Sequence, residues 1–428
     1  MVQNWRLNSK KKAMTGSSNS FVSKFTSPGD NSIIRNEGFE ALEYLPAPTR
    51  RSERWKYSPI TKLLTNSLST KESDSTVWPQ EISPNPVPHL DAYLIVFRNG
   101  VFISSLSDLP VSEGVVCSPM SSAGDQVFTN TYHKTEWVGA MNAAYHQDGM
   151  YLRVEKNVVL DRPIIVHHLT DGTDAACFPR HLISIAEGAE ANVVVWSSAT
   201  SESTGMNNGV LEAHIASNAH LKIDKICNEN GEVFHFSHEQ IIQESSSNYS
   251  MNTFTIMGHW VRNELNILSN GSGTDSVFNG TFLPTGSEHV DNHTTMDHAH
   301  PDGTSSELYR GIMYDNSTGE FNGKIFVRKD AQRTNAYQQN TNIVADKGAS
   351  INAKPELEIY ADDVKCSHGC TVGQFDTEAL FYLMSRGIDL KSAKSLLVRA
   401  FVGDVLNSVK SEDLRNEIMN LYSEKHNW

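Results

Sequence analysis

The sequence contains little of what marks secreted or membrane proteins. Its 428 residues include five cysteines, an odd number spread from Cys117 to Cys370, which makes no disulfide framework and fits a reducing compartment. No apolar run approaches the roughly 20 residues that span a bilayer. The basic N-terminus is followed by Ser, Thr and Asn rather than by the apolar stretch of a signal peptide. We therefore expect a soluble, cytoplasmic protein.

Basic residues are scarce as well. The chain has 36 Lys and Arg against 50 Asp and Glu, a formal net charge of -14. Nucleic-acid backbones and anionic membrane surfaces attract clustered Lys and Arg, so neither is an expected partner. One basic cluster, Arg50 to Lys56 around Trp55, is short. We interpret it as a salt-bridged junction between a helix and a strand rather than as an anion site.

Catalytic motifs are missing too. The sequence has no phosphate-binding G-x-x-x-x-G-K-[ST] loop, no G-x-G-x-x-G after a strand, no G-x-S-x-G nucleophile elbow and no H-E-x-x-H. We therefore expect a protein that is not an enzyme.

What the sequence does contain, from about Leu90 to Asp363, is a series of short alternating or β-branched runs separated by Gly, Asn, Asp and Ser. Such runs predict strands. They lie at 158–167, 181–186, 191–196, 221–226, 233–242, 252–257, 265–268, 277–283, 323–327 and 357–360. Hardly any segment between them has helical periodicity, so a parallel sheet with crossover helices is not expected.

A weak internal sequence repeat helps to choose among the all-β folds. Gly188–Val193, Asn218–Ile223 and Gly348–Ala353 each place a small turn pair before an alternating strand. Stacked coils of a β-helix would account for this repeat, with Val, Ile, Leu and Phe facing inward. The alternative is an antiparallel β-sandwich. We predict an all-β core formed by a parallel β-helix.

Helical regions are predicted on both sides of this core. Apolar positions 33, 34, 39, 42 and 45 predict a helix from about Ser32 to Leu45. At the other end, Asp376, Asp389 and Ser411 are predicted N-caps of three short helices. The predicted inward stripes of these helices are 380, 383 and 384, then 393, 396, 397, 400, 401 and 405, then 414, 418 and 421. We therefore divide the chain into an N-terminal region with short helices and a polar start (1–90), a β-helix core (91–370) and a C-terminal helical domain (371–428).

Metal chemistry is concentrated at Cys366, His368 and Cys370, which alternate directly after a strand-like run. A continuing strand would put all three on one face, where Asp362 and Asp363 could orient the imidazole. Thiolate and imidazole are ligands for zinc and for iron in sulfur clusters. Three ligands are one short of a closed tetrahedral site, which suggests a site that a partner completes. The alternative is structural, with Cys366 packed as a small hydrophobe and His368 bonded to backbone.

A second group of polar residues lies between Glu288 and His300. It comprises His289, His293, His298 and His300 with Asp291 and Asp297. The irregular spacing matches no metal-ligand pattern, and we expect a solvated polar ladder on a strand. The pair His167 and His168 is a weaker candidate, because adjacent strand residues face opposite ways.

Several stretches carry a family resemblance. They are RTNAYQQN at 333–340, KPELEIYADDVKCSHG at 354–369, TVG at 371–373 and LFYLMSRGI at 380–388, with further agreement at 291–295, 45–46 and 55–57. The chain closely resembles the SufD branch of the SufB/SufD family, scaffolds of the SUF system of iron-sulfur cluster assembly. The resemblance covers most of the chain. The sister scaffold SufB lacks the Lys-Cys-Ser-His-Gly string.

The resemblance implies a right-handed parallel β-helix flanked by helical regions, in a complex with a SufB-like scaffold and the SufC-like ABC ATPase. The C-terminal helices would dock the ATPase. His368 and Cys366 occupy the family's Cys-Ser-His-Gly positions, where the histidine contributes to a transient cluster at the interface with SufB. The isolated chain would hold no cofactor stably, and reduced flavin is associated with the assembled complex. Whether flavin contacts this subunit, and whether the isolated chain pairs with itself, stay open.

The chain departs from the family in two ways. Cys370 stands where the family commonly has alanine, so it is either an extra ligand or a tolerated small residue, and we favour the latter because cysteine packs as a small hydrophobe. The first 30 or so residues are longer and more polar than the resemblance implies, and we expect disorder there. Rival functions are a β-helix polysaccharide-active enzyme and a stable zinc-binding structural protein.

Overall fold

The computed structural model describes residues 21–26, 32–70, 78–123 and 132–427. The polar start predicted to be disordered therefore lies outside the described residues, except for 21–26. That short segment contradicts the expectation of disorder, because Phe21, Val22 and Phe25 are buried against the body of the protein. Three apolar side chains within five positions bury enough apolar surface to hold this segment in place. The sequence prediction overlooked them because the residues around them are polar.

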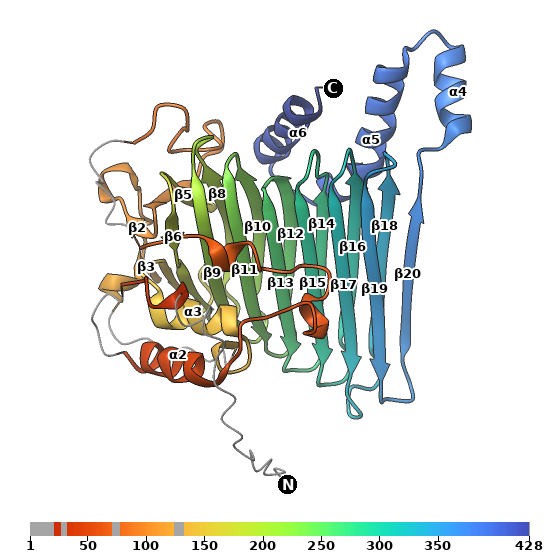
Figure 1. Ribbon diagram of the computed structural model, residues 1–428. Helices are drawn as coiled ribbons and strands as arrows, with labels where there is room; N and C mark the ends of the chain where they lie inside the picture. The colour runs from red at the N-terminus through yellow and green to blue at the C-terminus, as the bar shows by residue number, and fades with distance from the viewer. Residues whose placement is uncertain (1–20, 27–31, 71–77, 124–131, 428) are drawn as a thin grey trace.

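Two ten-stranded sheets form the body of the protein (Figure 1). Sheet 1 has the order β2-β1-β5-β8-β10-β12-β14-β16-β18-β20, and sheet 2 has the order β19-β17-β15-β13-β11-β9-β7-β4-β3, with β6 pairing to β9. The strands of sheet 1 are β1 (Tyr93–Arg98), β2 (Val101–Phe102), β5 (Ile164–Thr170), β8 (Glu190–Ala199), β10 (His220–Glu229), β12 (Asn248–Met257), β14 (Asp275–Phe282), β16 (Thr304–Met313), β18 (Asn335–Val344) and β20 (Lys365–Gly373). The strands of sheet 2 are β3 (Val115–Pro119), β4 (Met150–Val154), β6 (Ala175–Cys177), β7 (Arg180–Ile185), β9 (Thr204–Ile215), β11 (Glu232–Gln243), β13 (Trp260–Ser269), β15 (His289–His298), β17 (Thr318–Val327) and β19 (Ser350–Ile359).

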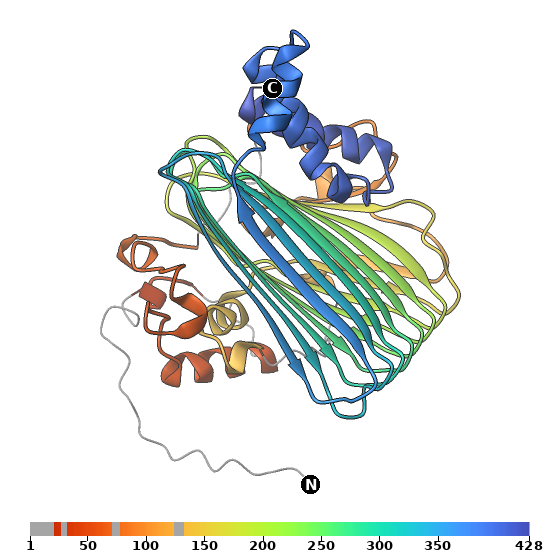
Figure 2. The same cartoon turned by 90° about the vertical axis from the view of Figure 1, so that its right-hand side faces the viewer.

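From β7 onward the chain alternates between the two sheets, and each strand bonds in parallel to the strand one coil away. His220, for example, lies beside Glu190 on one side and Asn248 on the other. Among the described strands only the β1–β2 and β3–β4 ladders are antiparallel. The predicted right-handed parallel β-helix is thus confirmed, and the β-sandwich alternative is wrong. Figure 2 shows the coils stacked in depth.

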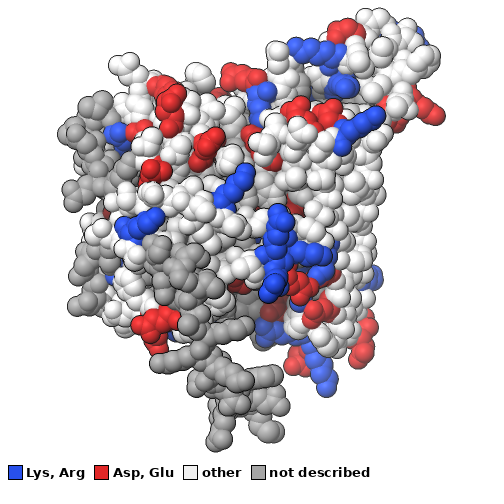
Figure 3. Space-filling view, viewed as in Figure 1, with Lys and Arg blue, Asp and Glu red and all other residues white. Residues whose placement is uncertain are grey.

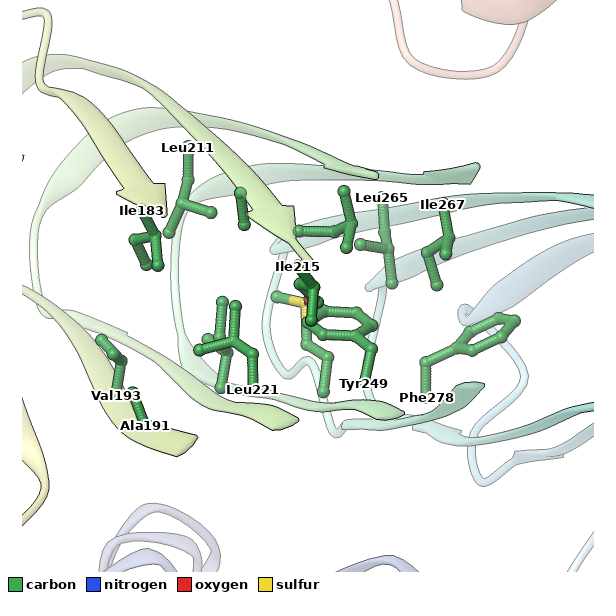
Figure 4. Packing of buried hydrophobic residues seen from close by; sticks show 14 of the residues in the cluster. Ile183, Ala191, Val193, Leu211, Ile215, Leu221, Tyr249, Leu265, Ile267 and Phe278 are labelled. Carbon is green, nitrogen blue, oxygen red and sulfur yellow. The ribbon is translucent and has the colours of Figure 1, made fainter. Parts of the chain in front are cut away.

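The space between the two sheets is filled by alternate side chains of every coil. Leu221 and Ile223 point inward from β10 and lie in register with Tyr249 and Met251 of β12. Figure 4 shows such residues from both sheets meeting across this interior. Full burial of each Leu or Ile side chain contributes about 1.5–3 kcal/mol. One continuous apolar core therefore holds the coils together.

The N-terminal region covers the outer face of sheet 2. Its helices are α2 (Ile33–Tyr44) and α3 (Trp137–Tyr145), with single turns η1 (Glu53–Trp55) and η2 (Leu63–Thr65). The sequence missed α3 because all nine of its residues are buried, which removes the one-sided apolar stripe that identifies a surface helix. The predicted helix at 32–45 is confirmed as α2, but Ile33 is 80% exposed and does not belong to its inward stripe.

The C-terminal helices are α4 (Thr377–Ser385), α5 (Leu390–Leu406) and α6 (Glu412–His426). The predicted caps are confirmed, since Asp376, Asp389 and Ser411 accept hydrogen bonds from the first turns of their helices. Helices α5 and α6 pack on the outer face of sheet 1. The α5 stripe is shifted from the predicted one: the buried residues are Ala393, Val398, Val402, Val405 and Leu406, whereas Leu396 is 48% exposed.

The described helices include none that combines the length and the apolar character required to cross a bilayer.

Candidate functional site

The β-helix is open at its C-terminal end. β20 bonds only to β18 and ends sheet 1, while β19 bonds only to β17 and ends sheet 2. Figure 1 shows these two strands as the outer edge of the stack, beside the helices α4 and α5. Each edge strand presents backbone N–H and C=O groups that no other described strand satisfies.

Cys366, His368 and Cys370 all lie on β20. Cys366 pairs with Ala336 of β18, and His368 and Cys370 pair with the next alternate residues, Gln338 and Asn340. These three β18 residues are buried and face the interior, so the three predicted ligands also face the interior side of the edge strand. Cys366 is partly buried against the core, whereas His368 and Cys370 are exposed.

The three side chains share a face but do not converge on one point. Alternate residues of a strand lie roughly 6.6 Å apart, farther than donors to a single ion. In the described part of the chain, two other sets of His, Cys, Asp or Glu bring three ligand atoms within 4.8 Å of one another, and neither contains Cys366, His368 or Cys370. The arrangement suits separate ligands to a cluster of several metal ions, or one ligand of a site shared with another chain.

Both thiols of this strand favour the protonated form, because burial raises the pKa of Cys366 and that of Cys370. Cys370 Sγ lies 3.7 Å from Asn340 Oδ1 and can donate to it. A metal would have to displace these protons. Asp362 and Asp363 do not orient the imidazole as expected: in the part of the chain that the structure describes, no hydrogen bond joins either carboxylate to His368.

A buried carboxyl group lies two coils behind this strand, on β16. Glu307, Gln338 and His368 stand in register on β16, β18 and β20. Gln338 Nε2 donates to Glu307 Oε2 at 2.7 Å, and Thr294 Oγ1 donates to Glu307 Oε1 at 2.6 Å. Burial raises the pKa of Glu307 to about 7. Sequence reasoning missed Glu307 because neither β16 nor β18 was predicted as a strand.

The polar segment at 288–300 differs from the prediction. It forms β15, but Asp291 and His293 are buried rather than solvated. Asp291 pairs with Arg262 Nη1, and its Oδ1 lies 2.9 Å from His293 Nε2. The N-terminal segment lies over them, with Ser58 Oγ 2.5 Å from Asp291 Oδ2. This cover comes from more than 200 positions away in the sequence, so strand periodicity could not predict it.

His298 belongs to the interior instead. Its Nε2 lies 3.0 Å from Ser305 Oγ of β16. His300 is exposed in the turn after β15. The histidines of the segment are therefore distributed over the outer face, the interior and a turn, and they form no common site.

In the basic cluster around Trp55, Arg54 forms salt bridges of the kind predicted for a junction. Arg54 pairs with Glu264 of β13 and, at 3.5 Å, with Glu136, and Lys354 Nζ lies 3.2 Å from Glu53. On the face shown in Figure 3, basic and acidic side chains are interspersed.

His167 and His168 face opposite sides of β5, also as predicted. His167 Nδ1 lies 2.7 Å from the carbonyl oxygen of Pro84, and His168 Nε2 lies 3.0 Å from His181 Nε2. Burial lowers the pKa of both imidazoles, so both are neutral at physiological pH.

Two family models together match most of the chain. The model described as the SufBD core domain of SUF system FeS cluster assembly matches residues 168–401, and the SufBD protein N-terminal region matches residues 22–166. The chain belongs to the SufBD family. The β-helix with its open end is therefore the body of a protein of the SUF system of iron-sulfur cluster assembly.

Individual relatives of the SufBD family agree over nearly the whole length. The iron-sulfur cluster assembly protein SufD of Escherichia coli is 29% identical, covering 87% of this chain and 88% of the relative. A SufBD family protein of Synechocystis is 28% identical over 91% of this chain and 90% of its own. Protein ABCI7, chloroplastic, of Arabidopsis thaliana is 26% identical over 90% and 84%. The SufD resemblance seen in the sequence is thereby confirmed.

Proposed function

We propose that this protein is a non-enzymatic scaffold subunit that lends His368, with Cys366, to an iron-sulfur cluster assembled between it and a SufB-like partner. The cluster is the cargo of the complex and is bound only during assembly. Cys370 has the weakest claim as a ligand, because it is the position that departs from the family. The complex would work in the cytoplasm.

The open edge of β20 supports this proposal. An edge strand readily pairs with a strand of another chain. A second β-helix docked on β19 and β20 would bring its own ligands to the face that carries His368. The ligand set of this chain is incomplete by itself, and such docking would complete it.

Helix α4 supports the proposed contact with a SufC-like ATPase. It has no buried residue, and its Phe381, Tyr382 and Met384 are 75%, 58% and 46% exposed. Contiguous exposed apolar side chains mark protein interaction sites. The ATPase would therefore cover α4 and its neighbourhood, and nucleotide-driven movement would be transmitted to the adjacent β20 edge.

Replacement of His368 tests the cluster role. His368→Ala in the chain co-expressed with both partners should reduce the iron and sulfide content of the purified complex by at least about tenfold, because the loss of a residue that only orients a ligand already costs about 10–100-fold in metal affinity. Ser367→Ala, on the opposite face of the same strand, is the matched control and should leave the content unchanged. Equal cluster content in the two variants, with the complex intact, would refute the role of His368.

A further inference from the structure

A compact set of ligands lies inside the β-helix, away from the open end. Cys227 and Glu229 stand at the end of β10, and His235 follows on β11 after a tight turn. Cys227 belongs to the core between the sheets, and His235 faces the same interior because its neighbours Phe234 and Phe236 pack on the opposite, outer side. All three residues are buried.

The three ligand atoms are already close. Cys227 Sγ, a Glu229 carboxylate oxygen and a His235 ring nitrogen lie within 4.8 Å of one another. Glu229 Oε2 is 3.9 Å from the sulfur and 3.2 Å from His235 Nδ1. Tetrahedral coordination with bonds of 2.0–2.3 Å places donors roughly 3.3–3.6 Å apart. The two distances from Glu229 lie on either side of this range, and the remaining one, between Cys227 Sγ and the His235 nitrogen, is below 4.8 Å.

Two buried polar atoms beside the set have no hydrogen-bond partner. His235 Nε2 and Asn207 Oδ1 are both unpaired, in residues that are 4% and 2% exposed. Asn207 also contacts Glu229, with Nδ2 3.1 Å from Oε1. Unpaired buried groups cost about 1–3 kcal/mol each. Because an amide can be turned to exchange its oxygen and nitrogen, Asn207 is the candidate for a fourth ligand.

The charges at this corner favour a divalent cation. Glu229 is fully buried, and the two lysines whose charges reach Cys227 already have carboxylate partners: Lys225 pairs with Glu239 at 2.7 Å and Lys425 with Glu288 at 2.6 Å. A thiolate and a carboxylate together carry two negative charges, which one divalent ion would neutralise. Binding of the ion would release the thiol proton of Cys227, which now points to the Met257 carbonyl at 3.4 Å, to solvent.

We propose that Cys227, Glu229 and His235 bind one divalent transition-metal ion of the Zn²⁺ or Fe²⁺ class inside the β-helix. A sulfur, nitrogen and oxygen donor set selects these ions over Mg²⁺ and Ca²⁺. The site is separate from the cargo ligands on β20 and does not depend on the proposed scaffold role. A resident ion departs from the expectation that the isolated chain holds no cofactor.

The other convergent set does not support a site of this kind. His289, Asp291 and Glu320 also bring ligand atoms within 4.8 Å of one another. The Ser58 hydroxyl lies between them, at 2.9 Å from His289 Nε2, 2.5 Å from Asp291 Oδ2 and 2.8 Å from Glu320 Oε2. It occupies the place that an ion would take.

Metal analysis of the full-length chain tests the proposal. Expressed alone in medium supplemented with zinc and iron, the purified chain should retain about one equivalent of metal. Cys227→Ser and His235→Ala should each reduce it at least tenfold, whereas Cys370→Ser and His289→Ala should not. Expression with cobalt gives a readout that does not depend on variants, since a thiolate ligand produces an intense near-ultraviolet charge-transfer band.

Three results would contradict the proposed metal site. One is a wild-type chain that contains no metal after expression with zinc and iron and after expression with cobalt. Another is metal that persists in a folded Cys227→Ser variant, and the third is metal that is lost in His289→Ala or Cys370→Ser instead. If Cys227→Ser fails to fold, the cobalt spectrum of a Cys366→Ser/Cys370→Ser double variant, which lacks the two thiols of β20, still decides whether an interior thiolate binds the ion.

Discussion

Gln338 lies directly beside His368 in the ladder that joins β18 to the edge strand β20. On its other side, Gln338 donates a 2.7 Å hydrogen bond to the buried carboxyl of Glu307. The exposed histidine at the open end is therefore the last member of a polar row that continues into the interior. The strand register thus places the candidate ligand two coils from a titratable group that is itself shielded from water.

Glu307 should make the stability of the protein depend on pH. Its pKa is raised from 4.5 to about 7 in the folded state, so the protonated form is favoured by folding. The resulting stabilisation is complete below pH 4.5 and is lost as the pH rises to 7, by about 3 kcal/mol. Glu307→Gln should remove this part of the dependence, because the Thr294 hydroxyl can turn to accept from the new amide. Denaturant unfolding of both proteins from pH 4.5 to 8 measures the difference, and parallel curves would contradict the prediction.

The buried pair of Arg262 and Asp291 should matter far more than an exposed pair of the same chemistry. Asp291→Asn removes the nearer carboxylate of the buried Arg262 and leaves it Glu264 at 3.7 Å, so it should destabilise the fold by about 3 kcal/mol. Asp302→Asn removes the partner of Arg333 at the surface and should cost at most about 1 kcal/mol. Equal losses in urea unfolding would show that the outer face of sheet 2 is more hydrated than the structure indicates.

Truncation of isoleucine should cost very different amounts of stability at a buried and at an exposed position. Ile223→Ala opens a cavity between the two sheets and should cost about 2–5 kcal/mol. Ile33→Ala removes a side chain that is 80% exposed and should change the stability by less than about 0.5 kcal/mol. Thermal unfolding of the two variants measures this difference. A large loss of stability in Ile33→Ala would indicate that Ile33 packs inward, as the sequence predicted.

Helix α4 should bind the ATPase without contributing to the fold. Phe381→Asp should abolish co-purification with a SufC-like partner while leaving the melting temperature unchanged, because Phe381 is 75% exposed. Deletion of residues 376–428 is a blunter test, since it also uncovers the face of sheet 1 that Val402 and Ile418 bury. Glu378→Gln on the same helix serves as the control. Undiminished ATPase binding by Phe381→Asp would place the contact elsewhere.

The open end should allow the isolated chain to pair with itself. Exposed Tyr337, Ile359 and Val372 surround the unpaired edges of β19 and β20. We expect a concentration-dependent dimer in sedimentation analysis, and a Val372→Lys substitution should shift it towards monomer. A strictly monomeric wild-type chain would indicate that the edge is recognised only by a different partner.

Much of the β-helix followed from local pattern. The turn pair at Gly188 and the alternating strand after it repeat one coil later, because each coil must bury one row of side chains and expose the other. The caps at Asp376 and Ser411 are also local, since a side-chain oxygen needs only the next turn of backbone. Helix α3 escaped prediction because burial on all sides removes its periodicity.

The sequence by itself determined the coil repeat, the helix caps and the alternation that puts Cys366, His368 and Cys370 on one face. Only the tertiary structure decided that this face belongs to an open edge, that β15 is covered by Ser58, and that Cys227 and His235 meet inside. The physical reason is the distance along the sequence over which each interaction acts. Strand alternation and capping depend on neighbours a few residues away, whereas burial and ligand geometry depend on which coils and which distant segments pack together.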